Sequence, residues 1–483
     1  MIRFRFFLAF CLILALSFPA AAPAETAPED AGLDLLDELE SGGDELGGDL
    51  FDDLEAETAP EQEPRSRAEK ILAKIMENLK NEITLRYSRF LEDPPENRQV
   101  DDNPDIVYSS WDFETWTGED SWKLGFSGWA QTGNAEDRFA GITQWPQDRD
   151  RRSRHLALNE LYTIIYRDDY DLTLGRKLFN NGLSALYSPA NRFAQADFND
   201  PLYPRQFGIW QARLDYYWKD TTFTGAWLPV YQASKDPSPN SRWEVTSNQG
   251  RRDFDFPKLL IPLQQKLTRV YPDVEGSNFG YFLRGKTTYR GWDAFVSYFH
   301  GPNPFWVLKQ RLEGFTIVYT KKVVTVDNYA AGFSTAWKKW EFHGEALMSI
   351  ADDGRDDDYL SYVGGFSYTL DDRVRPLGLE QVILTLEYAR ETTLEEQDEA
   401  GYVQSSASSR VGHDDVIARV SMKYDEDLSF TFHTHLETGG EGGQLYRGEI
   451  SYDIRPGLEL SLAGEMFMGD GSSYYGRWDD NDR

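Results

Sequence analysis

The sequence predicts an all-β transmembrane protein, an antiparallel up-and-down β-barrel of about 18 strands that follows a short N-terminal periplasmic helix. Three observations lead to this prediction. The chain begins with an export signal, alternating apolar and polar runs of about ten residues recur to its end, and aromatic residues make up 14% of a chain in which 27% of the residues are charged. Strands that face lipid on one side and a watery lumen on the other have this mixed composition.

Residues 1–24 have the parts of a secretory signal peptide. Two arginines precede an apolar stretch over residues 6–18, and a cleavage site of small residues ends at Ala24. The only cysteine, Cys11, lies inside the apolar stretch, so the exported chain is expected to have no disulfide and no thiol-bound metal.

Residues 25–66 form an acidic tail. They contain sixteen acids and one base, Arg65, so about half of the net charge of −31 belongs to this segment. Its charge, glycines and prolines predict a disordered, solvated segment in the periplasm. Its leucines leave open the alternative that the tail docks a periplasmic partner as a short helix. The negative charge argues against nucleic acid as a partner.

Residues 67–82 are predicted to form an amphipathic helix in the periplasm. Ile71, Leu72, Ile75 and Met76 fall on one face at helical spacing. The helix would close the periplasmic mouth of the barrel or contact another protein, and a plain packing helix is an equal alternative.

Residues 83–483 contain the predicted barrel, and residues 209–231 illustrate its repeating unit. There Leu214 and Trp218 lie on one face of a strand and Arg213 lies on the other, before a polar turn starts a second alternating run. With a periplasmic N-terminus, odd strands should rise to long outer loops and even strands should descend to tight turns. Rising strands are expected to begin near Ile83, Trp122, Tyr170, Thr222, Trp292, Lys339, Leu379, Leu428 and Leu458. Descending strands are expected to begin near Val107, Arg154, Ile209, Ser277, Val326, Tyr359, Asp414 and Leu445.

These nine rising and eight descending strands make seventeen, and the connections between them test that count. The count requires residues 311–325 to belong to an outer loop. Segments 232–276 and 301–325 are long enough to fold inward as constrictions, and 256–267 has the pattern of a short helix that would suit a lid. Because single-chain bacterial barrels generally have an even number of strands, an eighteenth strand is expected beyond Arg483. The long outer connections are 133–153, 179–208, 232–276, 301–325 and 393–413.

The residues between the lipid-facing positions should face the lumen. Six of them are basic, and arginine offers planar, bidentate donors that suit carboxylates. They are candidates for a pore-lining strip that guides an anion, with the alternative that they pair with luminal acids and stiffen the wall. The six bases are Arg213, Arg284, Lys286, Arg419, Lys423 and Arg447. The luminal acids and histidines are Asp215, Glu341, His343, Glu345, Glu387, His433, His435, Glu437, Glu449 and Glu465.

Catalytic and metal sites are not predicted. The chain has no G-x-S-x-G motif and no histidine beside a serine in a nucleophilic setting, so we expect neither enzyme activity nor a cofactor. His433 and His435 share a face with Glu437, but no further ligand follows at fixed spacing, so no metal is expected. The basic run 149–155 could bind lipopolysaccharide phosphates, and internal pairing between its arginines and aspartates is the commoner alternative.

The segment 172–218 resembles Gram-negative outer-membrane barrels of the alginate-export kind. Those barrels often have a strand that ends in G-R-Q, a loop with glycine and proline, and a strand entered through arginine and glycine. Here Lys177 replaces the usual glutamine, and Asn181 stands where tryptophan is common. The resemblance implies a monomeric channel of about eighteen strands and does not fix the substrate. The matching residues are Gly175, Arg176, Gly182, Pro189, Arg205 and Gly208, with Leu174 and Pro201 beside them.

Arg176 does not fit the alternation of its strand. It shares parity with Leu172 and Leu174, which should face lipid. Either the strand has ended by this point or a bulge re-aims the side chain.

These features predict a channel in the outer membrane of a Gram-negative bacterium, with a periplasmic N-terminus. It would pass a hydrophilic, anionic solute or polysaccharide by passive, charge-guided diffusion. Outer-membrane lipid and lipopolysaccharide would surround it. A general diffusion porin and a non-transporting outer-membrane scaffold or adhesin are the alternatives.

Overall fold

The computed structural model describes residues 67–94, 100–238, 240–243, 263–272, 279–371, 373–439, 442–471 and 473–483. The predicted signal peptide (1–24) and acidic tail (25–66) lie outside these residues. The chain divides into two units, Met1–Glu69 and Lys70–Arg483, and the second contains the sheet. Among the described residues, no helix is both long enough and apolar enough to cross a membrane.

One antiparallel sheet dominates the second unit. It has nineteen strands, and seventeen of them follow one another along the chain, with each strand pairing with the next one in this series. This up-and-down order confirms the predicted fold class. The strands begin within about three residues of the expected positions, except β13, which begins at Thr316 and not near Val326. The seventeen are β1 (Lys80–Arg89), β2 (Asp105–Glu119), β3 (Trp122–Gly133), β4 (Leu156–Tyr166), β5 (Tyr170–Lys177), β8 (Ile209–Trp218), β9 (Thr221–Leu228), β11 (Gly280–Tyr289), β12 (Trp292–Glu313), β13 (Thr316–Trp337), β14 (Trp340–Ala351), β15 (Asp358–Leu370), β16 (Gln381–Glu395), β18 (Asp414–Lys423), β19 (Leu428–Glu437), β20 (Gln444–Arg455) and β21 (Leu458–Met468).

The two ends of the sheet differ, and we call them the short-turn end and the long-loop end. At the short-turn end, two residues separate β8 from β9, β11 from β12, and β13 from β14. Lys219, Arg290 and Lys338 in these turns have φ values of 53°, 51° and 57°. Left-handed backbone of this kind matches the twist of the flanking strands in two-residue hairpins. These turns confirm the tight connections expected between the strands.

The connections at the long-loop end contain small elements of their own. A separate two-stranded sheet lies between β5 and β8, and the remaining elements are short turns of helix. These elements are β6 (Ala196–Asp197), β7 (Arg205–Gln206), η1 (Pro189–Asn191), η2 (Asp352–Gly354), η4 (Ser406–Ser409) and η5 (Gly476–Asn481); η3 (Arg375–Leu377) lies in the connection from β15 to β16.

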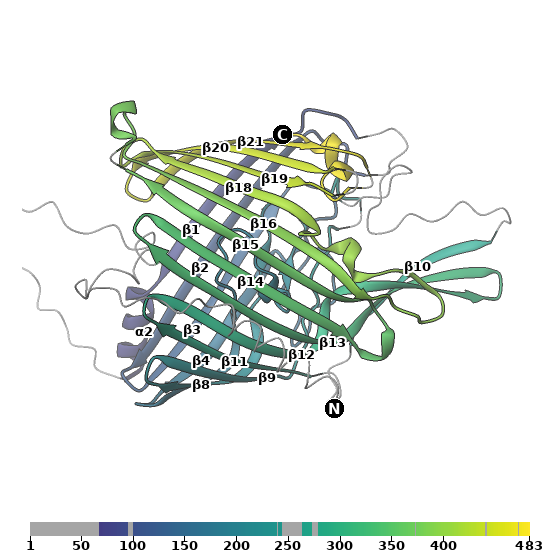
Figure 1. The fold of residues 1–483 in the computed structure, drawn as a ribbon, viewed down its shortest axis with the longest axis horizontal. Coiled ribbons are helices and arrows are strands. Elements are labelled where there is room, and N and C mark those ends of the chain that lie inside the picture. Colours follow the sequence, from purple (N-terminus) through teal and green to yellow (C-terminus); the bar gives the residue numbers. More distant parts are fainter. Residues whose placement is uncertain are drawn as a thin grey trace, which may run out of the picture. The chain divides into compact units, whose positions relative to one another are not determined.

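Strands β12 and β13 project beyond the rest of the sheet at the long-loop end (Figure 1). Each is 22 residues long, and the hairpin closes at Gly314 and Phe315. β10 (Gln264–Val270) pairs with β13, and β17 (Tyr402–Gln404) pairs with β12, so the projecting backbone finds hydrogen-bond partners on both sides. The predictions of an outer loop over 311–325 and of an inward fold over 301–325 are therefore wrong.

The helical lid predicted over residues 256–267 also differs from the structure. Residues 264–267 belong to β10, which pairs in parallel with β13. Pairing with this neighbour outweighs the weak local helical pattern. Residues 256–262 lie outside the described residues.

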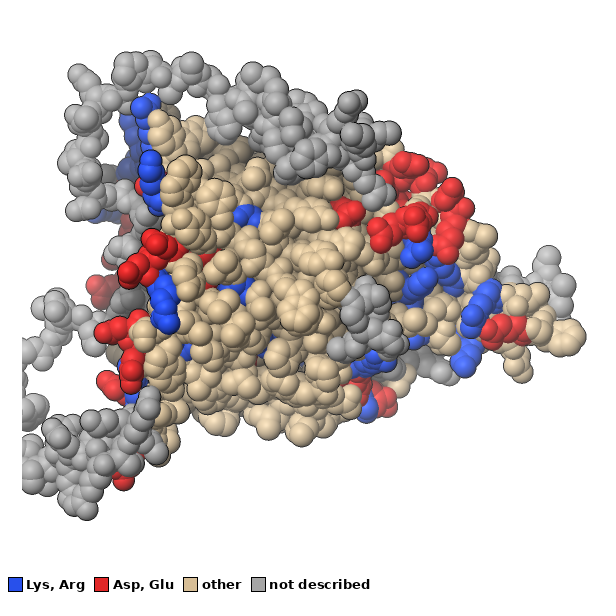
Figure 2. Space-filling view, turned by 90° about the horizontal axis from the view of Figure 1, so that it is seen from below, with Lys and Arg blue, Asp and Glu red and all other residues tan. Residues whose placement is uncertain are grey.

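The sheet is apolar on its outer face and polar on its inner face. Leu85, Leu214 and Leu462 are exposed on the outside, whereas His343 and Glu387 on the inside are only 2% and 1% exposed. Figure 2 shows a broad band of surface with very few charged residues, with charged groups gathered at its two ends. The alternation read from the sequence therefore gives the correct faces.

The edge strands β1 and β21 come together at the C-terminal residues. Among the described residues, β1 pairs only with β2 and β21 only with β20. Leu91 N donates a hydrogen bond of 2.8 Å to Asp482 O, and the backbones of Glu465 and Arg483 exchange hydrogen bonds of 2.7 and 3.0 Å. Asp482 and Arg483 thus link the two edges of the sheet at the long-loop end.

The helix α2 (Arg67–Glu77) is shorter than the predicted 67–82, because β1 already begins at Lys80. It lies against β2 at the short-turn end. Lys74 Nζ donates to Gly118 O at 2.6 Å, and Thr115 Oγ1 donates to Ile75 O at 2.6 Å.

Candidate functional site

The connection between β5 and β8, residues 178–208, crosses the space enclosed by the inner face of the sheet. It bonds to Glu345 on β14 and Glu387 on β16. Farther along it bonds to Asp112 on β2 and Glu465 on β21, which lie in a distant part of the sheet order. Because it reaches both walls, we call this segment the inward loop. From the sequence, 179–208 was predicted to be a long outer connection, and the inward constrictions were predicted in segments 232–276 and 301–325.

Glu345 is the first anchor of the inward loop. Its carboxylate accepts hydrogen bonds from Leu183 N (2.5 Å), Ser184 N (2.7 Å) and Ser188 Oγ (2.7 Å). Gly182 allows this close approach, since a Cβ there would lie 2.0 Å from Ser188 Oγ. The buried carboxylate thus satisfies backbone donors that have left any regular structure.

Glu387 is the second anchor. It accepts hydrogen bonds from the backbone nitrogens of Ala185, Leu186 and Tyr187, each at 2.9 Å, and His343 Nε2 lies 2.8 Å away. An ionised carboxylate has acceptor sites for all four groups. Three successive peptide groups are therefore held by one side chain of the wall.

Glu391 connects the inward loop to the connection between β16 and β18. Arg192 Nη1 lies 2.5 Å from its carboxylate, and Arg410 forms an ion pair with the other oxygen. The two guanidinium groups lie 5.2 and 4.0 Å from the ring of Tyr359. All these charges are buried and paired, so this cluster joins two loops.

Arg176 points inward, contrary to strict alternation. β5 still pairs with both neighbours at this residue, but Gly175 before it has a φ of 121°. That backbone turn re-aims the guanidinium, and Nε donates to Gly208 O at 2.9 Å. A side chain at position 175 would clash, because a Cβ would lie 2.3 Å from Leu161 O.

The other motif residues also belong to the inward loop. Pro189 opens η1, where its missing N–H costs no hydrogen bond. Arg205 forms an ion pair of 2.6 Å with Asp112 on β2. All six residues of the resemblance therefore shape or anchor the inward loop and its flanks.

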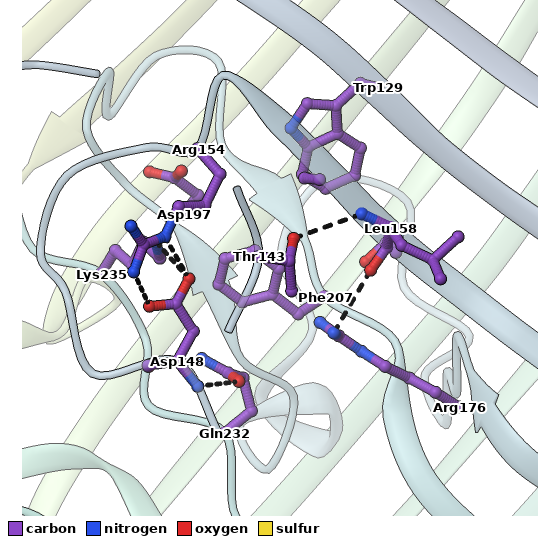
Figure 3. A pocket seen from close by; sticks show the side chains of 12 residues that line it. Trp129, Thr143, Asp148, Arg154, Leu158, Arg176, Asp197, Phe207, Gln232 and Lys235 are labelled. Carbon is purple, nitrogen blue, oxygen red and sulfur yellow. Dashed lines mark hydrogen bonds and ion pairs between the residues drawn. The ribbon is translucent and has the colours of Figure 1, made fainter. Parts of the chain in front are cut away.

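A buried ion cluster ties two further connections together beside Arg176 (Figure 3). Asp148 accepts hydrogen bonds from Arg154 at 2.6 and 2.5 Å and from Lys235 at 3.2 Å. Burial alone would raise the pKa of Asp148, but the Arg154 hydrogen bond and the Lys235 charge hold it below its ordinary value. Arg154 and Arg152 also pair with Asp150, so two arginines of the basic run 149–155 are paired within the run.

The six predicted anion-guiding residues lie in two groups. Arg213, Arg284 and Lys286 lie on β8 and β11, and Arg419, Lys423 and Arg447 lie on β18 and β20, with five strands of the meander between the groups. Arg213 pairs with Asp215 at 2.8 Å, and Arg447 pairs with Glu449 at 2.5 Å. Within the described chain, no acidic group lies within 4.0 Å of Arg284, Lys286, Arg419 or Lys423.

A polar cavity of about 50 Å³ lies between β1, β2, β3 and the inward loop. Arg138 and Arg205 reach it and pair with acids, Arg138 with Asp200 at 3.8 Å. Arg86 on β1 also lines it, and its guanidinium lies 3.4 Å from the ring centre of Tyr203. No ion pair of Arg86 occurs in the part of the chain that the structure describes. Three guanidinium groups, two of them paired, therefore share one small polar space with the carboxylates of Asp197 and Asp200.

Two of the luminal histidines, His343 and His435, are held by hydrogen bonds, whereas His433 Nε2 is buried without a partner in the described chain. His435 Nε2 lies 2.9 Å from Asp415 Oδ2, and its Nδ1 lies 2.7 Å from Tyr475 Oη. No group of three or more His, Cys, Asp or Glu side chains that could hold a metal ion occurs among the described residues.

Sequence reasoning missed several of these roles. Arg86 lies between Leu85 and Tyr87, and its parity marks it as luminal, so the same rule could have found it. Arg138 lies in a loop, where alternation gives no signal. Glu345 and Glu387 were identified as luminal, but nothing in the local sequence indicates that they hold a loop.

The fold and its two faces define the class of an antiparallel up-and-down β-barrel with an apolar exterior and a polar interior. No family model and no curated protein matches the chain.

The solved structures that match the chain include a porin. A BenF-like porin from Pseudomonas fluorescens Pf-5 is 11% identical with a TM-score of 0.46, over 84% of this chain and 96% of that one. OccK9 (OpdG) of Pseudomonas aeruginosa is 12% identical with a TM-score of 0.44, over 82% and 95%. OpdQ of the same organism is 13% identical with a TM-score of 0.43, over 82% and 94%. The resemblance to alginate-export barrels stays a prediction.

Proposed function

We propose that the protein is an outer-membrane channel that passes a hydrophilic, anionic solute or polysaccharide by passive, charge-guided diffusion. The observation that carries the proposal is the set of luminal bases without an acid within 4.0 Å, of which Arg86 lines the polar space between the inner wall and the inward loop. Selectivity in such a channel comes from the charge on the wall and from the inward segments that narrow it.

The outer face of the sheet supports a place in a membrane. Most strands have 8 to 15 residues, and about 9–11 residues suffice for a tilted strand to cross a bilayer core. Leucines and aromatic residues cover this face, and charged residues gather at its ends (Figure 2). A surface of this kind is stable against lipid, and we assign the surrounding lipid and lipopolysaccharide as its contacts.

The preference for anions is supported by the luminal bases that are not ion-paired within the described chain. Within the described chain, these bases lie at luminal positions without an acid within 4.0 Å; they are Arg86, Arg284, Lys286, Arg419 and Lys423. Such groups keep their full attraction for an anion, whereas a paired base is largely neutralised by its neighbour. The paired Arg213 and Arg447 are assigned to stiffening the wall.

Bilayer recording of the refolded, full-length protein under a salt gradient tests the proposal. The reversal potential should indicate anion preference. The variant R86Q/K286Q/R419Q/K423Q should reduce this preference, because it removes four unpaired positive charges. The matched control R213Q/D215N removes one charge of each sign and should leave the preference unchanged. A large pore without ion selectivity would instead indicate a general diffusion porin.

A closed, non-conducting scaffold is the second candidate, and the anchored inward loop favours it. Glu345 and Glu387 hold that loop across the interior through six hydrogen bonds from residues 183–188. Silence of the intact protein in the bilayer, with conductance restored in E345Q/E387Q, would support this candidate over the channel.

A further inference from the structure

A second cavity, of about 270 Å³, lies at the long-loop end. Five chain segments enclose it: 187–201 of the inward loop, 234–243, 304–306 at the base of the projecting hairpin, 409–411, and 474–478. None of the six predicted anion-guiding residues and none of the arginines of the smaller cavity lines it. It is therefore distinct from the site on which the channel proposal depends.

Aromatic rings dominate the wall of this cavity. Trp243 and Trp478 pack edge to face with ring centres 5.6 Å apart, and Tyr474 packs against Trp478 at 5.3 Å. Phe305 and Trp306 add two more rings from the base of the hairpin. Aromatic faces of this kind offer flat apolar contact area with a partly negative surface.

The charged groups at the cavity are already engaged. Arg192 and Arg410 share the carboxylate of Glu391. The Arg477 guanidinium stacks 4.0 Å from the Tyr474 ring, and Asp236 pairs with Lys321 at 3.2 Å. An incoming ion would therefore have to compete with partners inside the protein.

Two neutral polar groups at the cavity lack partners within the described chain. Trp306 Nε1 and Ser409 Oγ are buried and make no hydrogen bond, although both residues line the cavity. Trp306 as a whole is 7% exposed. A buried donor or hydroxyl without a partner is destabilising, so such groups generally meet a ligand or water.

We propose that this cavity binds a sugar ring of a neutral saccharide. A pyranose has an apolar face of C–H groups that can stack on an indole and an edge of hydroxyl groups that can bond to Trp306 Nε1 and Ser409 Oγ. The volume lies just below the range of roughly 300–1,000 Å³ typical of small-molecule sites, which fits one or two rings. This inference goes beyond the channel proposal, because binding at this site requires no conduction.

Binding to the full-length protein in detergent micelles tests the inference through quenching of tryptophan fluorescence. The probes are neutral tetrasaccharides of glucose, xylose and mannose, with polyethylene glycol of similar size as a polymer without rings. Saturable quenching by at least one saccharide and none by the glycol is the expected result. Saturable quenching by none of the three, or equal quenching by the glycol, would overturn the inference.

Conservative variants locate the site. W306F keeps a ring and loses the unpartnered donor, and S409A loses the unpartnered hydroxyl. Each should weaken binding roughly tenfold, equivalent to about 1.4 kcal/mol, while the resistance to urea stays the same or rises, because no internal hydrogen bond is lost. The controls W129F and T173V remove an unpartnered indole N–H and an unpartnered hydroxyl from residues that do not line this cavity, and they should bind normally. Equal affinity of W306F, S409A and the parent would contradict the assignment.

A bilayer recording separates this inference from the channel proposal. Conduction without block by any saccharide, together with no quenching, would overturn the sugar site and leave the channel intact. Quenching by a saccharide in a protein that conducts no ions would overturn the channel and leave the sugar site intact.

Discussion

His343 Nε2 lies 2.8 Å from Glu387 Oε1, and both side chains are fully enclosed. The same carboxylate receives the backbone N–H groups of Ala185, Leu186 and Tyr187. Glu387 is therefore held on the wall side by a histidine and holds the inward loop on the lumen side. Glu387 thus holds residues 185–187, while Glu345 and Glu391 hold neighbouring parts of the loop.

Substitution of Glu387 should loosen the inward loop. In E387Q an amide NH₂ group replaces one carboxylate oxygen. This group cannot accept hydrogen bonds from the N–H donors that it faces, so the free energy of unfolding should fall by about 1–3 kcal/mol. Urea unfolding in micelles measures this change, and limited proteolysis should cut the inward loop faster. The exposed turn variant E426Q is the matched control. Unchanged proteolysis of E387Q would contradict the anchoring role.

Gly175 should not tolerate a side chain. Its φ is 121°, and a Cβ at this position would lie only 2.3 Å from Leu161 O. G175A should therefore lose roughly 1–3 kcal/mol of stability. G448A on β20 is the control, because a Cβ there meets nothing within 4 Å. Thermal unfolding of both variants measures the difference. Equal stability would mean that the turn at Gly175 does not aim Arg176.

How much of this structure can be predicted from the sequence depends on how far apart in the sequence the interacting residues lie. Alternation and tight turns are local, so the strands, their faces and the short-turn end are predicted from residues such as Leu214 and Lys219. The contacts in the interior join residues that lie far apart in the sequence. Ala185 and Glu387 meet across 202 residues of chain, and no periodic pattern indicates that contact. The projecting hairpin was missed for a related reason, since β10 and β17 come from distant segments and extend the pairing of β12 and β13.

The cluster around Asp148 should depend on pH. Because Arg154 and Lys235 hold the folded pKa of Asp148 below its ordinary value of 3.8, its contribution to stability is present above that value. The contribution is lost as the pH falls through the folded pKa. At pH 7, D148N should be less stable by roughly 3 kcal/mol, since two cations lose a buried partner.

Urea unfolding of the parent and D148N from pH 7 down to about pH 2 measures this effect, and the two stabilities should converge at the acidic end. D150N is the control, because Asp150 is 23% exposed and should contribute less. A difference between the parent and D148N that does not shrink on acidification would contradict the ion cluster as the cause.

A charge on the outer face should distinguish a lipid-facing wall from one that faces water. Leu214 lies in the middle of β8 with its side chain exposed outward. Near the middle of a bilayer, an arginine at such a position costs about 2–4 kcal/mol. L214R should therefore fold less stably in lipid vesicles, as urea titration of tryptophan fluorescence would measure. Leu312 is also exposed, but it lies on the hairpin that projects beyond the sheet (Figure 1). L312R should leave the stability unchanged, because the tip of this hairpin would extend beyond the bilayer into water. Equal stability of L214R, L312R and the parent protein in vesicles would contradict a membrane-embedded sheet.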